Sequence, residues 1–249
     1  MTDTPKPPDA AQLLRDLQHS EELKHQPIAM LGLDPQLAML RGWQANRLAR
    51  TYADLLANPR YSPACEFFLS DIYAPRDFSQ RDHDLERIYT FLSRVLPAPT
   101  LQLLTETVEL NRMTNMLDHR LLRVLIDQLG VVDTLTPELY AHAYCICDNY
   151  AERVHQIELT QSILMQVSVG ARQRLVGAAI KMAKIPAQRA GWVDLYGFLE
   201  RGQHAFKQMK DAQTFVDTII QREMSILDLI YHTDFAGFVK LAGLTSTPS

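Results

Sequence analysis

Apolar positions recur along most of the chain with a period near 3.6 residues, and almost no segment alternates between apolar and polar residues. That period gathers apolar side chains on one face of a helix, whereas a half-buried strand would alternate. Prolines mark most boundaries between the periodic segments, because proline removes a helical hydrogen bond. The pattern predicts about nine helices, over residues 9–25, 34–58, 61–73, 79–96, 100–129, 136–168, 170–184, 186–210 and 211–232.

The connections between these segments are short, which predicts one all-α multi-helix bundle over residues 9–243, with flexible termini at 1–8 and 244–249. Asp34-Pro35 and Thr136-Pro137 each place a capping residue before a proline at the first helical position. Two points stay open. The segment 136–168 is one long helix or two, and Gly202 either bends the segment 186–210 or divides it.

The segment 65–79 predicts a helix, a corner and a second helix. Its apolar stripe, at positions i, i+3, i+4 and i+7, consists of Cys65, Phe68, Leu69 and Ile72. Pro75 disfavours helical angles at the preceding residue and ends the first helix. Aromatic and charged residues gather at this corner, either to lock the loop or to bind a partner. The hypothetical binding residues are Phe67, Asp71, Tyr73, Arg76, Asp77 and Arg81.

The same segment resembles the FFLEELY motif, the heptapeptide that names a family of bacterial proteins without an assigned activity. Four positions match the heptapeptide outright, namely Phe67, Phe68, Leu69 and Tyr73. Asp71 and Ile72 are conservative replacements, and Ser70 replaces an acid by an uncharged residue, which fits a solvated position. The resemblance covers the heptapeptide alone. It implies a bacterial origin and a helical fold, and it supplies no catalytic residues.

Composition narrows the class of protein. Apolar residues make up 47% of the chain and charged residues 22%, which is typical of a soluble globular protein. The net charge of −4 gives no broad basic field, so we expect no binding to nucleic acid. No apolar run approaches the roughly 20 residues that cross a bilayer, and the polar N-terminus does not have the pattern of a secretory signal. The three cysteines form no disulfide framework, so we expect the cytoplasm.

Two Glu-x-x-His pairs offer a candidate chemistry, at Glu22-His25 and Glu152-His155. This spacing puts a carboxylate and an imidazole on one helix face, as in bundle proteins that bind two metal ions. Such a site also needs a Glu from each of two further helices, and Glu106 or Glu109 and Glu223 could serve. Glu223 stands among apolar positions, and these residues form the alternative hypothesis of a metal- or ligand-binding enzyme. The simpler interpretation of Glu223 is a structural ion pair, with Arg153 as the proposed partner.

The remaining signals favour a binding protein. The chain has no phosphate-binding glycine loop and no nucleophile elbow. Four cations could touch an acidic partner, although a solvated helix face explains them more simply; they are Arg172, Arg174, Lys181 and Lys184. We therefore expect a non-enzymatic helical protein that binds a protein partner or assists regulation, without a metal or cofactor, while the question of an enzymatic activity stays open.

Overall fold

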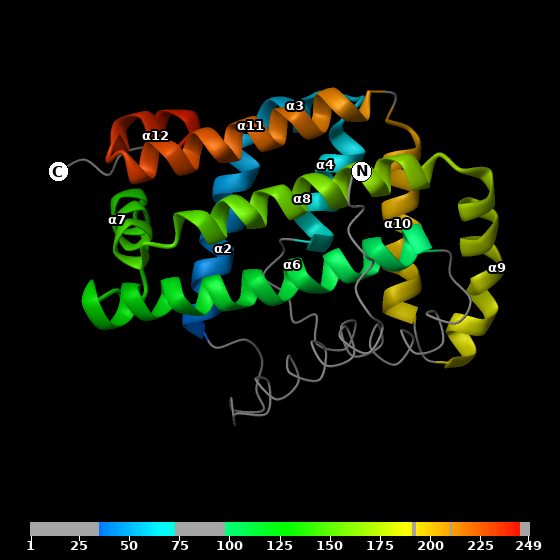
Figure 1. Ribbon diagram of the computed structural model, residues 1–249, viewed down its shortest axis with the longest axis horizontal. Coiled ribbons are helices and arrows are strands. Elements are labelled where there is room, and N and C mark those ends of the chain that lie inside the picture. Colours follow the sequence, from blue (N-terminus) through cyan, green and yellow to red (C-terminus); the bar gives the residue numbers. More distant parts are fainter. Residues whose placement is uncertain (1–34, 73–97, 191–192, 210, 245–249) are drawn as a thin grey trace, which may run out of the picture.

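Figure 1 shows the protein as a computed structural model, which describes residues 35–72, 98–190, 193–209 and 211–244. Within these residues the chain forms ten α-helices, two short π-helices and no β-strand, so the predicted all-α class is confirmed. None of the described helices combines the length and the apolar composition needed to cross a membrane. The predicted helices at 9–25 and 79–96 lie outside the described residues.

The described helices follow one another along the chain, with π-helices labelled η, as α2 (Pro35–Thr51), α3 (Ala53–Ala57), α4 (Ser62–Phe67), η1 (Phe68–Ile72), α6 (Ala98–Arg123), η2 (Val124–Gln128), α7 (Pro137–Cys147), α8 (Tyr150–Ala171), α9 (Arg174–Ala190), α10 (Val193–Lys207), α11 (Ala212–Tyr231) and α12 (Phe235–Leu241). The predicted segment 34–58 corresponds to α2 and α3. The predicted segment 61–73 corresponds to α4 and η1, since the helix widens at Phe68 without ending there.

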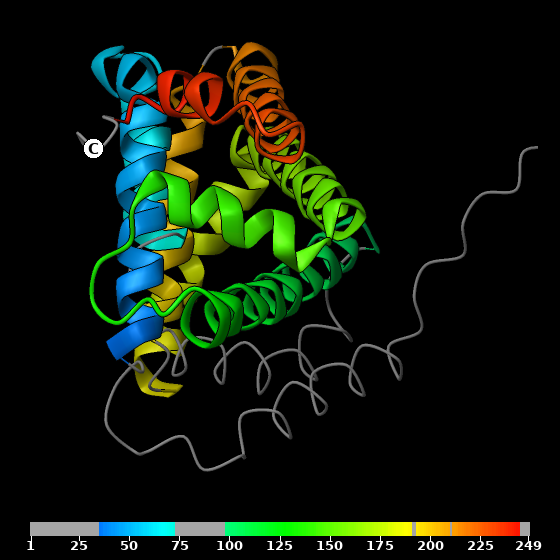
Figure 2. The ribbon, with the colours of Figure 1, turned by 90° about the vertical axis from the view of Figure 1, so that its left-hand side faces the viewer.

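Three long helices form the body of the bundle. α8 contacts both α6 and α11, and the three run roughly side by side in Figure 1. α2 crosses them and contacts α6. Figure 2 shows the result end-on, as a three-sided body with α7 lying across the opening. α10 and α9 lie at the opposite end, where α9 is the outermost described helix.

Two hydrophobic clusters form most of the core. One surrounds Tyr140 and Phe238, where α7 and α12 meet the ends of α6 and α11. The other surrounds Tyr52, Phe206 and Phe215, where α4 and α10 meet α2 and the first half of α11. α2 and α11 supply residues to both clusters, so they join the two ends of the bundle.

The segment predicted as one helix or two is two helices. Thr136 caps α7 by accepting a hydrogen bond from the Leu139 amide at 3.3 Å, and Pro137 follows it, as the sequence predicts. α7 ends at Asp148, which has a left-handed backbone with φ of 45°. Aspartate tolerates this conformation better than most residues. The chain turns there, and α8 begins at Tyr150.

Near the end of the chain one predicted boundary is wrong, and one helix was not predicted. Pro186 does not begin a helix, because α9 continues through it to Ala190. A proline inside a helix removes one hydrogen bond. The neighbouring turns are exposed, with Met182 79% and Ile185 61% accessible, so water can satisfy the freed carbonyl there. The predicted single helix at 211–232 is followed by a further helix, α12, which Asp234 caps.

Gly202 does not divide α10, which continues through it from Val193 to Lys207. A Cβ at this position would lie 2.9 Å from Cζ of Phe67. The glycine therefore lets the aromatic ring of α4 approach the backbone of α10 closely, and its role is packing.

Candidate functional site

Of the six side chains of the predicted corner site, the structure describes that of Phe67. Phe67 is buried, and its ring centroid lies 5.2 Å from that of Phe198 and 6.2 Å from that of Phe206. The backbone of Asp71 belongs to η1, but its side chain lies outside the described residues. Tyr73, Arg76, Asp77 and Arg81 also lie outside them. Phe67 thus has a packing role, and a binding role for the corner stays a prediction.

The side chain of Phe68 is 4% exposed and belongs to the same cluster as Phe67. The predicted apolar stripe is thus confirmed as a core-facing stripe at Cys65 and Phe68, which are both buried. Burial raises the pKa of the Cys65 thiol to about 11, so this thiol is neutral and unreactive at ordinary pH.

The residues of the metal hypothesis do not converge. Glu152 pairs with Arg120, with 3.3 Å between carboxylate oxygen and guanidinium nitrogen. His155 contacts Glu109, a proposed ligand, at 3.2 Å from Nε2 to the carboxylate. Within the described ranges no three His, Cys, Asp or Glu residues stand close enough to hold a metal ion. Glu22 and His25 lie outside those ranges.

Glu223 is held by Arg47, and the predicted pairing with Arg153 is wrong. Two guanidinium nitrogens of Arg47 donate to the two carboxylate oxygens of Glu223, at 2.5 and 2.9 Å. The hydroxyl of Tyr52 donates a third hydrogen bond to this carboxylate at 2.6 Å. Burial alone would lower the pKa of Arg47, but the charge and hydrogen bonds of Glu223 outweigh it and raise that pKa.

Arg153 has a different environment. Its guanidinium lies 4.4 Å from the ring centroid of Tyr144 and donates to the side chain of Gln156 at 3.1 Å. No carboxylate of the described residues lies within ion-pair distance of it. These contacts stabilise the cation by a cation–π interaction inside the bundle. Arg47, Arg153 and Glu223 are therefore structural groups of the interior.

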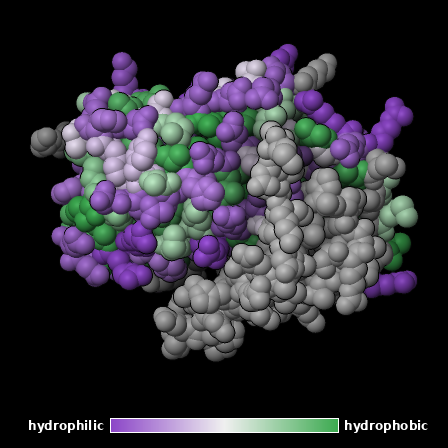
Figure 3. Space-filling model, in the orientation of Figure 1, coloured by the Kyte–Doolittle hydropathy of each residue, from purple (hydrophilic) through white to green (hydrophobic). Residues whose placement is uncertain are grey.

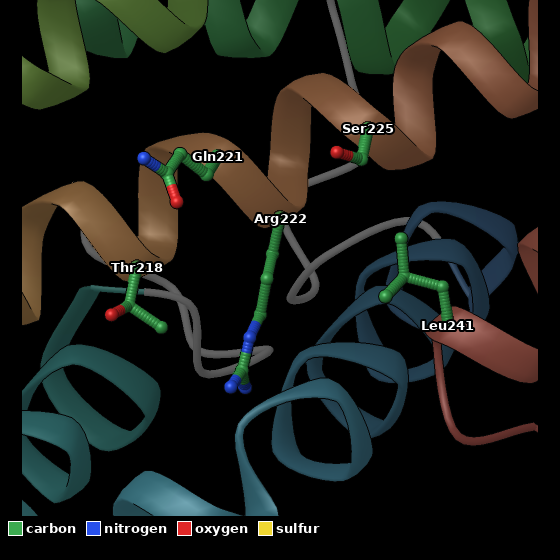
Figure 4. A pocket seen from close by; sticks show the side chains of 5 residues that line it. All are labelled: Thr218, Gln221, Arg222, Ser225 and Leu241. Atoms are coloured by element: carbon green, nitrogen blue, oxygen red, sulfur yellow. The ribbon is translucent and has the colours of Figure 1, made fainter.

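A first surface hollow lies between α11 and α12, with a volume of about 330 Å³ (Figure 4). Arg222 crosses it and points from α11 toward α2 and α3. Two nitrogens of Arg222 donate to the Asp54 carboxylate, both at 2.7 Å, and one also donates to the Thr51 carbonyl at 2.9 Å. The charged group of this hollow is thus already neutralised, and its role is to clamp α11 to the α2–α3 junction.

A second hollow lies between α9 and α10, with a volume of about 380 Å³. We call it the α9–α10 hollow. Its basic lining residues are Arg172, Arg174, Lys181, His204 and Lys207. Its described acid is Glu200, which accepts a hydrogen bond from the Tyr196 hydroxyl at 2.9 Å. Among the described lining residues four permanent cations thus accompany one acid, although the whole chain carries −4.

Two hydrogen bonds fix the floor of the α9–α10 hollow. Arg172 donates to the carbonyl of Met209 at 2.6 Å, and Gln203 donates to the carbonyl of Ala171 at 3.3 Å. Both bonds join the end of α10 to the turn between α8 and α9. The start of α9 and the last turns of α10 are thus held beside each other, and their basic residues share one surface.

Exposed apolar side chains are frequent in the part of the chain that forms this basic hollow. Five of the nine large apolar residues that are exposed in the described part of the chain lie between residues 169 and 199, namely Val169, Met182, Ile185, Val193 and Leu199. The right-hand edge of Figure 3, where α9 lies in the same orientation, shows hydrophobic and hydrophilic atoms projecting side by side. We call the outer surface of α9 together with the hollow the α9–α10 face.

Sequence analysis found part of this face and missed the rest. It named Arg172, Arg174 and Lys181, but it missed His204 and Lys207, which α10 brings to the same hollow. The distribution of charge along the chain indicates a basic segment here. Residues 159–193 contain five arginines and lysines and none of the 29 acids of the chain. That imbalance shows a basic segment, but only the pairing of α9 with α10 shows a basic hollow.

The fold and this surface define an all-α helical-bundle protein with a basic and apolar face at one end. The chain belongs to the family described as a domain of unknown function, DUF8198, which matches residues 24–236. No curated protein and no solved structure gives a significant match. The resemblance to the FFLEELY motif stays a prediction.

Proposed function

We propose that this protein is non-enzymatic and acts by binding a protein partner, and that the α9–α10 face is the docking surface. The observation that carries the proposal is the coincidence of exposed apolar side chains with unneutralised cations on one outer helix. Large apolar side chains that stay in water on a folded protein often mark an interaction site when they cluster and polar residues surround them.

The position of α9 supports this proposal. Among the described helices it packs mainly against α10 and to a lesser extent against α8, so most of its outer surface is open. Met182 is 79% exposed and Ile185 61% exposed, one turn apart on that surface. Burying two such side chains against a partner is worth roughly 1.5–3 kcal/mol each before the costs of association.

A protein partner fits this face better than nucleic acid. A nucleic-acid site needs a continuous basic surface that follows the phosphates. Here the apolar pair Met182 and Ile185 lies beside the cations Lys181 and Lys184 on α9, and adjoining apolar and charged side chains are typical of protein–protein interfaces.

We also propose that the binding takes place in the bacterial cytoplasm. The three cysteines support a reducing compartment, because all of them are free thiols in the described residues. The bacterial origin follows from the motif resemblance of residues 67–73 and stays part of the proposal.

Site-specific photo-crosslinking in the protein's own cells tests the docking surface. A photoreactive amino acid is placed at Met182 or Ile185, and at Val132 as the control. Val132 is equally apolar and 73% exposed, but lies between η2 and α7 at the other end of the bundle. We expect the same discrete protein adduct from positions 182 and 185 and none from 132.

The crosslinked protein is then identified, purified and titrated against the full chain. Ile185→Asp should weaken its binding at least tenfold, which is about 1.4 kcal/mol, and Val132→Asp should leave the affinity unchanged. Adducts at all three positions, or at neither 182 nor 185, would contradict the proposal.

A further inference from the structure

We propose that the partner segment recognised by the α9–α10 face is an acidic amphipathic helix, whose carboxylates enter the α9–α10 hollow while its apolar side chains cover Met182 and Ile185. This inference rests on the proposed function and names the chemistry of the partner at that same site.

The cations of the face favour an acidic partner. Arg174, Lys181, Lys184 and Lys207 form no ion pair with any carboxylate of the described residues, although acids outnumber bases in the whole chain. α9 itself contains no acid from Arg174 to Ala190. A surface on which several cations outnumber the one described acid, Glu200, attracts a partner of the opposite sign and disfavours a basic one.

The basic and apolar residues of the face are spaced along α9 so that one ligand can reach both. On α9 five residues line the hollow, and four of them form a stripe at positions i, i+3, i+4 and i+7. These four are Arg174, Gly177, Ala178 and Lys181, and the fifth is Ile180. Met182 follows Ala178 by four residues, and Ile185 follows Lys181 by four. Residues four apart lie above one another on a helix. The basic stripe therefore continues directly into the apolar pair along about 16 Å of the helix axis.

The shape of this stripe fits a helix better than an extended segment. Ridges of side chains with helical spacing pack into the grooves of a second helix. A partner helix lying along α9 would direct one edge, carrying Asp or Glu, toward Lys181 and Lys207, and the adjoining edge, carrying apolar residues, toward Met182 and Ile185. This is the helix-in-groove mode of peptide recognition.

The two halves of the face have different roles. Ion pairs at exposed cations add little affinity, because water and salt screen them, but they orient the partner and speed its approach. The apolar pair supplies affinity through burial. Binding should therefore depend on both halves and weaken as salt rises.

A synthetic acidic amphipathic peptide of about 18 residues, long enough to form a helix on the face, is the probe. Three comparison ligands test the helical period, the negative charge and the class of macromolecule in turn. They are a peptide of the same composition with the period scrambled, a peptide with every Glu replaced by Lys, and a short DNA duplex. Binding to the full chain is measured by fluorescence anisotropy at about 50 and 300 mM salt, which span strong and weak screening.

We expect the acidic amphipathic peptide to bind and its affinity to fall at least tenfold between the two salt concentrations, while the comparisons bind at least tenfold more weakly. R174E together with K181E should abolish binding, and M182S with I185S should weaken it at least tenfold. The control is R123E with K240E, which reverses two exposed charges on α6 and α12 and should change nothing. Every charge variant replaces only exposed cations. Circular dichroism should therefore show the same helix content in these variants as in the unmodified protein.

Each contrary result has a definite meaning. Equal binding of the scrambled peptide or of the Lys peptide overturns the inference, and so does absence of binding by the acidic peptide. Equal or tighter binding of DNA, lost in R174E/K181E, makes the face a nucleic-acid site. If the crosslinked natural partner binds R174E/K181E with unchanged affinity, the proposed docking surface remains supported and the proposal of an acidic helix is refuted. If no adduct forms at 182 or 185, the docking surface itself falls.

Discussion

Arg47 on α2 and Glu223 on α11 form an ion pair through two hydrogen bonds, of 2.5 and 2.9 Å, although 176 residues separate them in the sequence. The side chain of Arg47 is 9% exposed and that of Glu223 is 19% exposed. Since α2 and α11 contribute to both hydrophobic clusters, this pair fixes the two helices that join the ends of the bundle. Neither Arg47 nor Glu223 lines one of the two surface hollows, so this ion pair is separate from the α9–α10 hollow that we assign to a partner.

Glu223→Gln should destabilise the protein by about 3 kcal/mol, because it leaves the buried charge of Arg47 without a counter-charge. The free energy of unfolding in urea measures the loss. Glu158→Gln, an exposed acid on α8, is the control and should change stability by less than about 0.5 kcal/mol. The double variant Arg47→Met/Glu223→Leu should recover most of the stability, since an apolar pair of similar volume removes both charges. A single-variant loss below 1 kcal/mol would contradict a tightly held pair.

Gly202→Ala should destabilise the protein by roughly 1–3 kcal/mol, because its new methyl group would lie 2.9 Å from Cζ of Phe67. Gly42→Ala is the matched control, since it also lies inside a helix but has no atom within 4 Å of the added Cβ. There the change should stabilise the protein by about 0.5–1 kcal/mol through helix propensity. Thermal melting of the two variants tests the contrast, and melting shifts of the same sign would refute the close contact.

Phe68→Ala should cost roughly 3–5 kcal/mol, because the ring is 4% exposed within the second cluster. Met182→Ala removes a large apolar side chain that is 79% exposed and should change stability by less than about 0.5 kcal/mol. Denaturant unfolding of both variants compares a core residue with a residue of the α9–α10 face. If Met182→Ala were the more costly change, Met182 would be part of the core and would not be available to a partner.

The Asp54–Arg222 clamp should give stability a defined pH dependence. The hydrogen bond from Arg222 lowers the pKa of Asp54 in the folded protein below its ordinary value of 3.8. The stabilising effect is therefore complete above the ordinary pKa and is lost as the pH falls through the lowered one. Asp54→Asn should be less stable at pH 7, and the difference from the unmodified protein should shrink below about pH 4. Urea unfolding between pH 7 and 3 measures it, and a constant difference would show that the clamp does not depend on this charge.

Much of the secondary structure could be read from local signals. The helical period, the cap at Thr136 and the burial of Phe68 depend on residues within a few turns of one another, and the structure agrees with them. The local rule failed at Pro186, where an exposed helix tolerates a proline. The ion-pair partner of Glu223 was also predicted wrongly. Several arginines could pair with it, and the sequence does not show which of them lies close to it. The sequence showed the cations that α9 brings to the α9–α10 hollow. It did not show that His204 and Lys207 of α10 line the same hollow.

The sequence by itself determined that this chain is helical and which faces of its helices are apolar, because both follow from spacing along the chain. Only the tertiary structure decided that Arg47 meets Glu223, that Phe67 requires a glycine opposite it, and that basic residues of α9 and α10 share a hollow. Each of these depends on how separate helices pack, and packing selects among many pairings that the same periodic pattern allows.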